Sequence, residues 1–145
     1  FNNTCQDILA GAREMMLGEL AYRKQDYARA FAHLRRSVQL DDDLPYDEPW
    51  GWMQPTRHAL GALLLEQGQV QDAAAVYRAD LGLDNTLSRA CQHPDNVWAL
   101  SGYYECLVRL GRRAAADIIR HRLTLAQARA DVAVTSSCFC RAESG

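Results

Sequence analysis

Apolar residues recur at steps of three and four along most of the chain, whereas the strict alternation of a half-buried strand is nearly absent. This periodicity is typical of amphipathic helices that bury one face. It predicts an all-α protein made of antiparallel helical hairpins. The predicted helices cover about 5–24, 27–40, 56–67, 71–81, 97–110 and 114–130.

Two of these helices carry broad apolar stripes that we expect to be buried. In the first helix the stripe consists of Ile8, Leu9, Ala12, Met15, Met16, Leu20 and Ala21. In the last helix it consists of Ile118, Ile119, Leu123, Leu125 and Ala126. Asp26 is a suitable N-cap for the second helix, Asp95 or Asn96 for the fifth, and Gly111 ends the fifth.

The segments between the helix pairs differ in composition from the helices. The run from about 41 to 55 is rich in acidic, proline and aromatic residues, and a second irregular stretch covers about 82–96. Trp50 and Trp52 are too apolar for a solvated linker, so we expect at least one of them to pack on the helices or on a partner. Asp41, Asp42 and Asp43 lack the spacing of a calcium loop and are interpreted as a helix stop.

Length and composition indicate one globular domain. The chain has 145 residues, of which 48% are hydrophobic and 23% charged, which excludes a disordered polymer and is enough to bury a core. We predict a single helical domain over 1–145, with a polar, cysteine-bearing tail over 131–145. Its repeat units cover about 11–44, 54–87 and 97–130.

Two helix pairs carry the same kinds of residue at the same offsets. Leu17-Gly18 is followed by Ala21, Gln25, Tyr27, Ala30, Leu34 and Ser37, and Leu60-Gly61 is followed by Leu64, Gly68, Val70, Ala73, Tyr77 and Asp80. Close helix approach requires small residues at Gly18, Ala30, Gly61 and Ala73. The pattern resembles the tetratricopeptide repeat (TPR) family, whose unit is about 34 residues, and implies a short TPR-like α-solenoid. The third unit departs from it, because Tyr104 occupies the small-residue position.

A narrower resemblance concerns three stretches of the chain. They are similar to the carboxy-terminal part of large microbial and fungal TPR proteins of unassigned function. The stretches are Tyr46-Asp47-Glu48-Pro49-Trp50, Pro55-Thr56-Arg57-His58-Ala59-Leu60-Gly61 and His93-Pro94-Asp95-Asn96-Val97-Trp98-Ala99-Leu100.

The TPR resemblance also implies a partner-binding groove along the first helix of each unit. The implied positions are Ala12, Met15, Glu19, Tyr22 and Arg23, then Pro55, His58, Ala62, Leu65 and Glu66, then Trp98, Ser101, Glu105, Val108 and Arg109. Tyr, Trp and Arg are common interface anchors. The candidate groove residues are Tyr22, Arg23, His58, Trp98, Glu105 and Arg109. The alternative is that the aromatic residues are structural and the arginines solvated.

The five cysteines do not define a disulfide framework, because their number is odd and their spacing irregular. Cys91, His93, Cys138 and Cys140 are the only set that suggests chemistry, since thiolates and imidazole suit zinc or copper(I). A disulfide and free thiols are the alternatives. An extended C-x-C segment disfavours a bond between Cys138 and Cys140, so if these cysteines are oxidised, a bond from one of them to Cys5 or Cys91 is the expected form. Cys106 is expected to be a small buried hydrophobe.

The sequence contains no recognisable catalytic motif. His33, His58, His93 and His121 lie on separate predicted elements, outside nucleophile, metalloprotease or phosphate-loop patterns. We therefore expect no enzyme activity and no cofactor. The formal charge of −2 disfavours nucleic acid and membrane surfaces, and no apolar run approaches the length of a membrane span.

These observations favour a non-catalytic scaffold that binds another protein or itself, forming a homo-oligomer or filament. The alternative function is a thiol or metal module built from Cys91, His93, Cys138 and Cys140. Asn2 satisfies the N-x-[ST] glycosylation pattern and favours a secreted or extracellular location. Because the chain begins without Met, we interpret it as a processed chain or part of a longer one.

Overall fold

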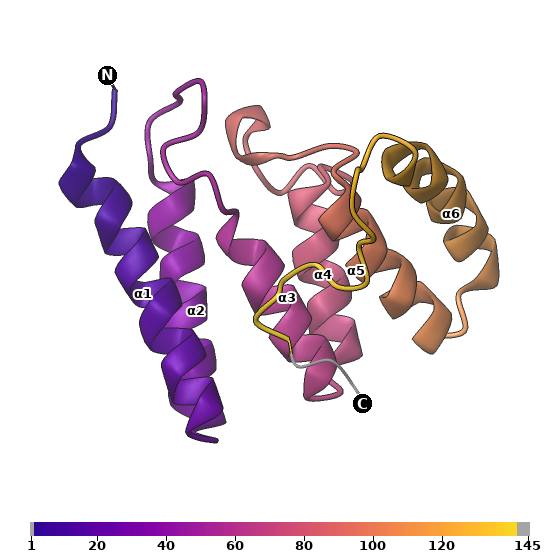
Figure 1. The fold of residues 1–145 in the computed structure, drawn as a ribbon, viewed down its shortest axis with the longest axis horizontal. Coiled ribbons are helices and arrows are strands. Elements are labelled where there is room, and N and C mark those ends of the chain that lie inside the picture. Colours follow the sequence, from indigo (N-terminus) through magenta and orange to yellow (C-terminus); the bar gives the residue numbers. More distant parts are fainter. Residues whose placement is uncertain (1, 142–145) are drawn as a thin grey trace. The chain divides into compact units, whose positions relative to one another are not determined.

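The protein is all-helical in the computed structural model, which describes residues 2–141 (Figure 1). The helices are α1 (Cys5–Arg23), α2 (Tyr27–Asp42), α3 (Thr56–Glu66), α4 (Val70–Asp80), the 3₁₀ helix η1 (Arg89–Cys91), α5 (Val97–Arg109) and α6 (Arg113–Gln127). No β-strand occurs within 2–141. The predicted all-α class is confirmed. The end of the predicted tail, 142–145, lies outside the described residues.

Two helix ends lie more than one residue from their predicted positions. Helix α2 continues past Leu40 through Asp41 and Asp42, because tertiary hydrogen bonds satisfy both carboxylates: Thr56 Oγ1 donates to Asp41, and Arg57 donates to Asp42. The last helix was predicted to reach residue 130 but ends at Gln127. The N–H groups of residues 129 and 130 instead donate three residues back, which tightens the final turn.

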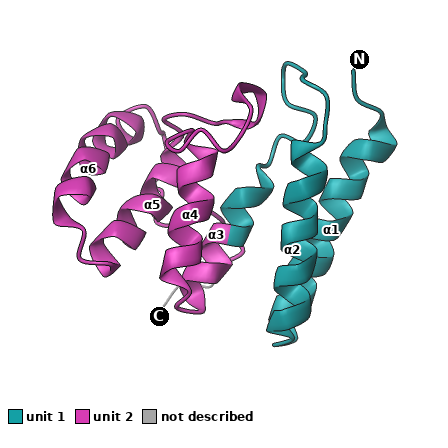
Figure 2. Cartoon of the chain, turned by 180° about the vertical axis from the view of Figure 1, so that it is seen from behind, with its two compact units in different colours: residues 1–60 teal, residues 61–145 magenta. Residues whose placement is uncertain are grey.

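The chain divides into two compact units, residues 1–60 and 61–145, and the division falls within α3 (Figure 2). In the first unit α1 packs against α2, and in the second α4 packs against α5 and α5 against α6. This packing of neighbouring helices is consistent with the predicted helical solenoid. The single domain over 1–145 stays a prediction.

A close approach between α1 and α2 depends on Gly18. A Cβ atom at Gly18 would lie 2.7 Å from Leu34 Cγ and 3.1 Å from the Ala30 carbonyl oxygen. Ala30 and Leu34 are fully buried. The predicted need for small residues at Gly18 and Ala30 is therefore confirmed.

The core of the second unit is organised around Tyr77 of α4, which is fully buried. A Cβ atom at Gly61 of α3 would lie 2.5 Å from Tyr77 Cζ, and one at Gly102 of α5 would overlap the same ring. The Tyr77 hydroxyl shares a 2.5 Å hydrogen bond with Ser137 Oγ. Tyr77 thus fills a slot between two glycines and reaches the carboxy-terminal tail.

Three helix-to-helix turns have the same geometry. Gln25, Gly68 and Gly111, spaced 43 residues apart, all have positive φ. In each case the next N–H donates to a carbonyl in the preceding helix, with lengths of 3.0, 2.9 and 2.9 Å. The third turn therefore keeps the repeat geometry despite Tyr104. Asp26 and Asn96 accept the predicted capping bonds, from the N–H of Arg29 and of Ala99 respectively.

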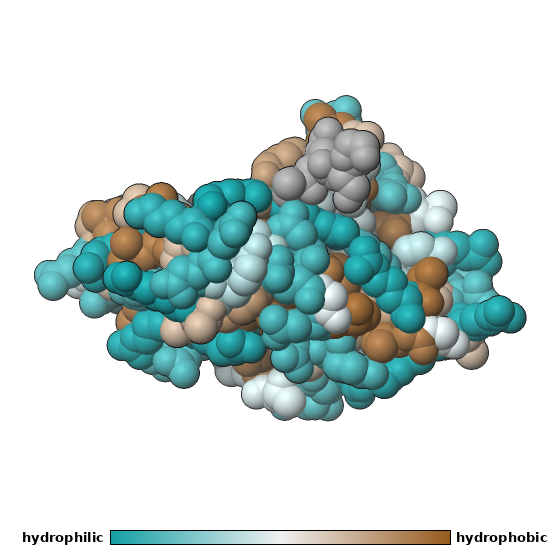
Figure 3. All heavy atoms as spheres, turned by 90° about the horizontal axis from the view of Figure 1, so that it is seen from below, coloured by the Kyte–Doolittle hydropathy of each residue, from teal (hydrophilic) through white to brown (hydrophobic). Residues whose placement is uncertain are grey.

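The predicted apolar stripes are only partly buried. In α1, Met15 and Ala21 are buried, but Leu9 and Met16 are each 60% exposed and Leu20 is 48% exposed. This helix is apolar on more than one side, and only one side can face α2. In α6, Ile119 and Leu123 are buried, whereas Ile118 and Leu125 are exposed. Figure 3 shows hydrophobic residues scattered among hydrophilic ones on one face of the molecule. In the part of the chain that is described, no helix combines the length and apolarity required to span a bilayer.

Candidate functional site

A groove of about 770 Å³ runs along α1 in the first unit. Its floor and walls come from the exposed face of α1 and from the loop that follows α2. The lining residues are Leu9, Ala12, Arg13, Met15, Met16, Glu19, Leu20, Arg23, Trp52 and Gln54. Its volume lies within the range of pockets that hold small ligands or short peptide segments. We call it the α1 groove.

The loop between α2 and α3 completes the α1 groove. Trp52 lines it, and Gly51 lies against Ile8, since a Cβ at Gly51 would be 3.1 Å from Ile8 Cγ1. The side-chain amides of Asn2 and Asn3 donate to the carbonyls of Tyr46 and Pro45, at 2.6 and 2.8 Å. We expected at least one loop tryptophan to pack on the helices. Trp52 lines the groove beside α1 and its indole nitrogen is buried, which confirms this expectation. The loop is therefore attached to the start of the chain through Asn2 and Asn3 and packs on α1 at Ile8.

Charged side chains sit among the apolar lining of the α1 groove. Burial raises the pKa of Glu19 above its ordinary value, and the nearby positive charge of Arg23 opposes that shift. The Arg23 guanidinium also lies 5.7 Å from the centre of the Tyr22 ring, within cation–π range. Arg13 interacts with Glu14 at 3.4 Å. The groove thus combines methionine and leucine side chains with two arginines and one carboxyl whose charge is disfavoured.

The candidate groove residues that lie within residues 1–60 take different roles. Tyr22 is 4% exposed and packs edge-on against Tyr27 and Phe31, so it belongs to the core. His58 is also buried, at 7% exposure. Arg23 does line the α1 groove. The TPR resemblance implies five positions in the first repeat unit, about 11–44, and all of them except Tyr22 line the α1 groove: Ala12, Met15, Glu19 and Arg23.

In the second unit Glu105 and Arg109 form part of an ion-pair network, while Trp98 is 42% exposed. Arg141 donates two hydrogen bonds to Glu105, at 2.7 and 3.1 Å, and Arg109 lies 2.5 Å from the same carboxylate. Arg109 also donates to the Leu65 carbonyl oxygen at 3.3 Å. Burial raises the pKa of Glu105, but the bonds and charges of the two arginines outweigh it and hold that pKa below its ordinary value.

The network fastens the carboxy-terminal tail to α5. Arg141 and Ser137 are not recognisable as site residues from the sequence, because neither belongs to a repeat or a motif. The one signal in the sequence is the polar run Thr135-Ser136-Ser137 directly before Cys138. Their role as anchors of the tail follows from their tertiary contacts, Ser137 with Tyr77 and Arg141 with Glu105.

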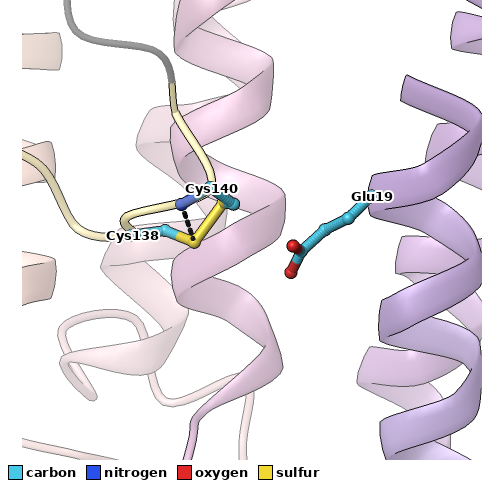
Figure 4. A group of neighbouring side chains, drawn as sticks. All are labelled: Glu19, Cys138 and Cys140. Carbon is cyan, nitrogen blue, oxygen red and sulfur yellow. Dashed lines mark hydrogen bonds between the residues drawn. A yellow bond between two sulfur atoms is a disulfide. The ribbon is translucent and has the colours of Figure 1, made fainter. Parts of the chain in front are cut away.

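Cys138 and Cys140 form a disulfide with each other (Figure 4). The pairing with Cys5 or Cys91, expected as the oxidised form, is therefore wrong, because neither of those cysteines takes part in a disulfide. The prediction assumed an extended C-x-C segment, but Phe139 and Cys140 form a turn. The turn brings the two Cα atoms to 5.1 Å, within the usual range for a disulfide. The Cys140 N–H also donates to Cys138 Sγ at 3.0 Å.

Cys91 and His93 do not join the other two cysteines in a metal site. No three of Cys91, His93, Cys138 and Cys140 place ligand atoms within 4.8 Å of one another. The Cys91 thiol accepts a hydrogen bond from Ser88. Cys106 is fully buried as expected, and burial raises the pKa of its thiol to about 12.

His93 belongs to a buried polar joint between α4 and α5. Its Nδ1 lies 2.8 Å from Asp80 Oδ1, and Asp80 is fully buried. Asn96 donates to Asp80 Oδ2 at 3.0 Å and caps α5 by accepting from the Ala99 N–H at 2.8 Å. This joint satisfies the Asp80 carboxylate and links the end of one helix to the start of the next.

The remaining candidate residues lie apart from one another. His33 pairs with Glu14 at 2.6 Å on the α1–α2 hairpin, while His121 is exposed on α6. Asn2 is exposed, and its amide nitrogen donates to Tyr46, so a glycan on it would replace that bond. Asp41 and Asp42 are engaged by Thr56 and Arg57 and belong to the last turn of α2, so of the three residues expected to stop the helix only Asp43 lies beyond its end.

No protein-family model, curated protein or solved structure matches this chain. The TPR resemblance therefore rests on the residues of the chain itself. Its consequences for function are accordingly part of the proposal below.

Proposed function

We propose that the chain is a non-catalytic scaffold of the TPR type that binds a segment of another protein in the α1 groove. The observation that carries this proposal is the lining of that groove. Ala12, Met15, Glu19 and Arg23 are the positions that the TPR resemblance implies for partner binding, and they line one concave surface. The repeat position of these residues and their place in the groove thus favour the same surface.

The repeat geometry supports the TPR assignment. Close contacts at Gly18 and Gly61 occur where the pattern requires small residues, and three turns 43 residues apart share the same backbone bond. In helical-repeat proteins the first helices of the units form the recognition surface. The α1 groove lies on such a first helix.

The chemistry of the α1 groove favours an apolar peptide segment that carries a carboxylate. Leu9, Met16 and Leu20 leave a large apolar surface uncovered, and methionine adapts well to varied side chains. Arg13 and Arg23 supply two positive charges, while burial disfavours the negative charge of Glu19. An acidic group beside one or two large apolar side chains would match both features.

The test uses arrayed synthetic peptides in three series: apolar with acidic residues, apolar with basic residues, and scrambled sequences of the same composition. We expect the first series to bind selectively, and we expect Leu20→Asp to weaken that binding by about tenfold or more. Leu125→Asp on α6 is the matched control, because that leucine is 69% exposed and lies outside the groove. Equal binding of all three series, or equal loss in both variants, would contradict the proposal.

Self-association is the second candidate, and the exposed Ile118 and Leu125 on α6 favour it. Apolar residues left uncovered at the last helix of a repeat array are a common route to assembly. Sedimentation over a range of concentrations separates the two candidates. An oligomer that Leu125→Asp dissociates and Leu20→Asp leaves intact supports assembly through α6, whereas a monomer at all concentrations removes this candidate.

A further inference from the structure

The tail that carries Cys138 and Cys140 is held on both sides of the disulfide. Before it, Ser137 shares a 2.5 Å hydrogen bond with the buried Tyr77 hydroxyl. After it, Arg141 donates two hydrogen bonds to Glu105. Since both flanks stay attached to α4 and α5, opening the disulfide would leave the two sulfurs close enough to bond again.

The two cysteines differ in exposure. Cys138 is buried, at 9% exposure, whereas Cys140 is partly exposed. An attacking thiolate therefore reaches Sγ of Cys140 first, and Sγ of Cys138 becomes the leaving group. The Cys140 N–H already donates to Cys138 Sγ at 3.0 Å, and such a bond stabilises negative charge on the departing sulfur. Access and hydrogen bonding thus favour the same direction of attack.

The short segment closed by the Cys138–Cys140 bond also favours reduction of that bond. A disulfide stabilises the folded chain mainly by restricting the unfolded chain, and the restriction grows with loop length. Cys138 and Cys140 are only two residues apart, so their bond restricts the chain very little. Disulfides that gain little from the fold are the more readily reduced ones.

Phe139 lies between the two cysteines and is 97% exposed. An aromatic side chain this exposed offers a large apolar contact surface next to the reactive bond. A polypeptide with an apolar residue near its own thiols would use that contact, whereas a small polar thiol would not.

We propose that Cys138–Cys140 is a redox-active disulfide that oxidises the paired thiols of a polypeptide substrate, with attack at Cys140. A substrate thiolate attacks Cys140 Sγ, forming a mixed disulfide and releasing the bonding electron pair to Cys138 Sγ, which takes up a proton. The second substrate thiolate then attacks the substrate sulfur of the mixed disulfide, which breaks its bond to Cys140 Sγ and releases Cys140 as a thiolate that takes up a proton. The products are a substrate disulfide and a protein with two thiols, so two electrons pass from the substrate to the protein.

The first measurement is a thiol count on the full chain by mass spectrometry after alkylation. We expect three alkylated cysteines in the unfolded, unreduced protein, at Cys5, Cys91 and Cys106, and all five after treatment with dithiothreitol. Five alkylated cysteines without reductant would show that the disulfide is absent and would overturn the proposal.

The second measurement follows oxidation of a reduced synthetic peptide that has two cysteines beside phenylalanine and leucine. We expect one peptide disulfide per chain, formed about tenfold or more faster than with an equal concentration of oxidised glutathione. Acid quenching should trap the peptide on Cys140. Oxidation no faster than with glutathione disulfide, or trapping mainly on Cys138, would contradict the mechanism.

Variants separate the site from the rest of the protein. The double variant Cys138→Ser/Cys140→Ser should lose the activity, while Cys91→Ser should retain it. Phe139→Ser should slow the reaction with the peptide by about tenfold but leave the rate with dithiothreitol unchanged. An equal effect on both rates would refute the substrate-docking role of Phe139. Oxidation is measured as loss of peptide thiols and groove binding as peptide affinity, so failure of the groove proposal and failure of this one are distinguishable.

Discussion

Replacing Gly61 with alanine tests the slot that Tyr77 occupies. The added Cβ would lie 2.5 Å from Tyr77 Cζ, 2.6 Å from Cε1 and 2.8 Å from the hydroxyl oxygen. Ordinary contacts of this kind are about 3.5–4.0 Å, so the ring would have to move by about 1 Å. It cannot move away freely, because Gly102 contacts it from α5 and its hydroxyl is bonded to Ser137.

The expected loss of stability follows from two opposing effects. Overpacking of a dense core costs typically about 1–3 kcal/mol. Alanine regains about 1 kcal/mol over glycine inside a helix. The net loss for Gly61→Ala is therefore about 1 kcal/mol, and Gly61→Leu, which must also place three more carbons, should lose about 3 kcal/mol.

Urea unfolding followed by circular dichroism measures these differences. Gly11→Ala is the matched control, because Gly11 is also within a helix but its Cβ would lie 3.9 Å from Leu40 Cβ, an ordinary contact. That variant should be more stable than the wild type by up to about 1 kcal/mol. In a Tyr77→Leu background the cost of Gly61→Ala should shrink, since the ring is gone. A Gly61→Ala protein as stable as the Gly11→Ala protein would refute the reasoning.

Three further variants test other contacts. Burial raises the pKa of Tyr77 above its ordinary 10.0, so folding stability should fall as the pH rises above about 10, and thermal melts of Tyr77→Phe should lack that decline. Arg141 and Arg109 hold the pKa of Glu105 below 4.5 despite its burial, so Glu105→Gln should reduce the loss of stability seen on acidification below about pH 5; an unchanged acid profile would contradict this. Arg57→Ala leaves Asp42 without two 2.6 Å hydrogen bonds and should cost about 2 kcal/mol in urea unfolding, whereas an effect under about 0.5 kcal/mol would show the pair to be dispensable.

The sequence alone was enough to locate the helices and turns. Apolar periodicity, capping residues such as Asp26 and Asn96, and the turn glycines act over a few residues, so they can be read without the fold. The repeat pattern also identified Gly18 and Gly61 as points of close approach, since spacing along a helix determines which residues meet a neighbouring helix.

The candidate site was predicted only in part. The first-unit groove positions implied by the TPR resemblance line the α1 groove with the exception of Tyr22, which instead packs on Tyr27 and Phe31. Because tyrosine has an apolar ring and a polar hydroxyl, it can line a groove or lie in the core, and the surrounding residues determine which. The exposed Leu9 and Leu20 were expected inside, because periodicity shows that a face is apolar but not which apolar face is covered.

Only the tertiary structure decided the role of the tail. The sequence favoured an extended Cys138-Phe139-Cys140 segment with a long-range disulfide, whereas the structure has a turn that bonds the two cysteines to each other. Arg141 and Ser137 were not recognisable as anchors, because their partners Glu105 and Tyr77 lie far away in the chain. Local elements follow from local sequence, but a tail without periodicity takes its conformation from the surface on which it folds.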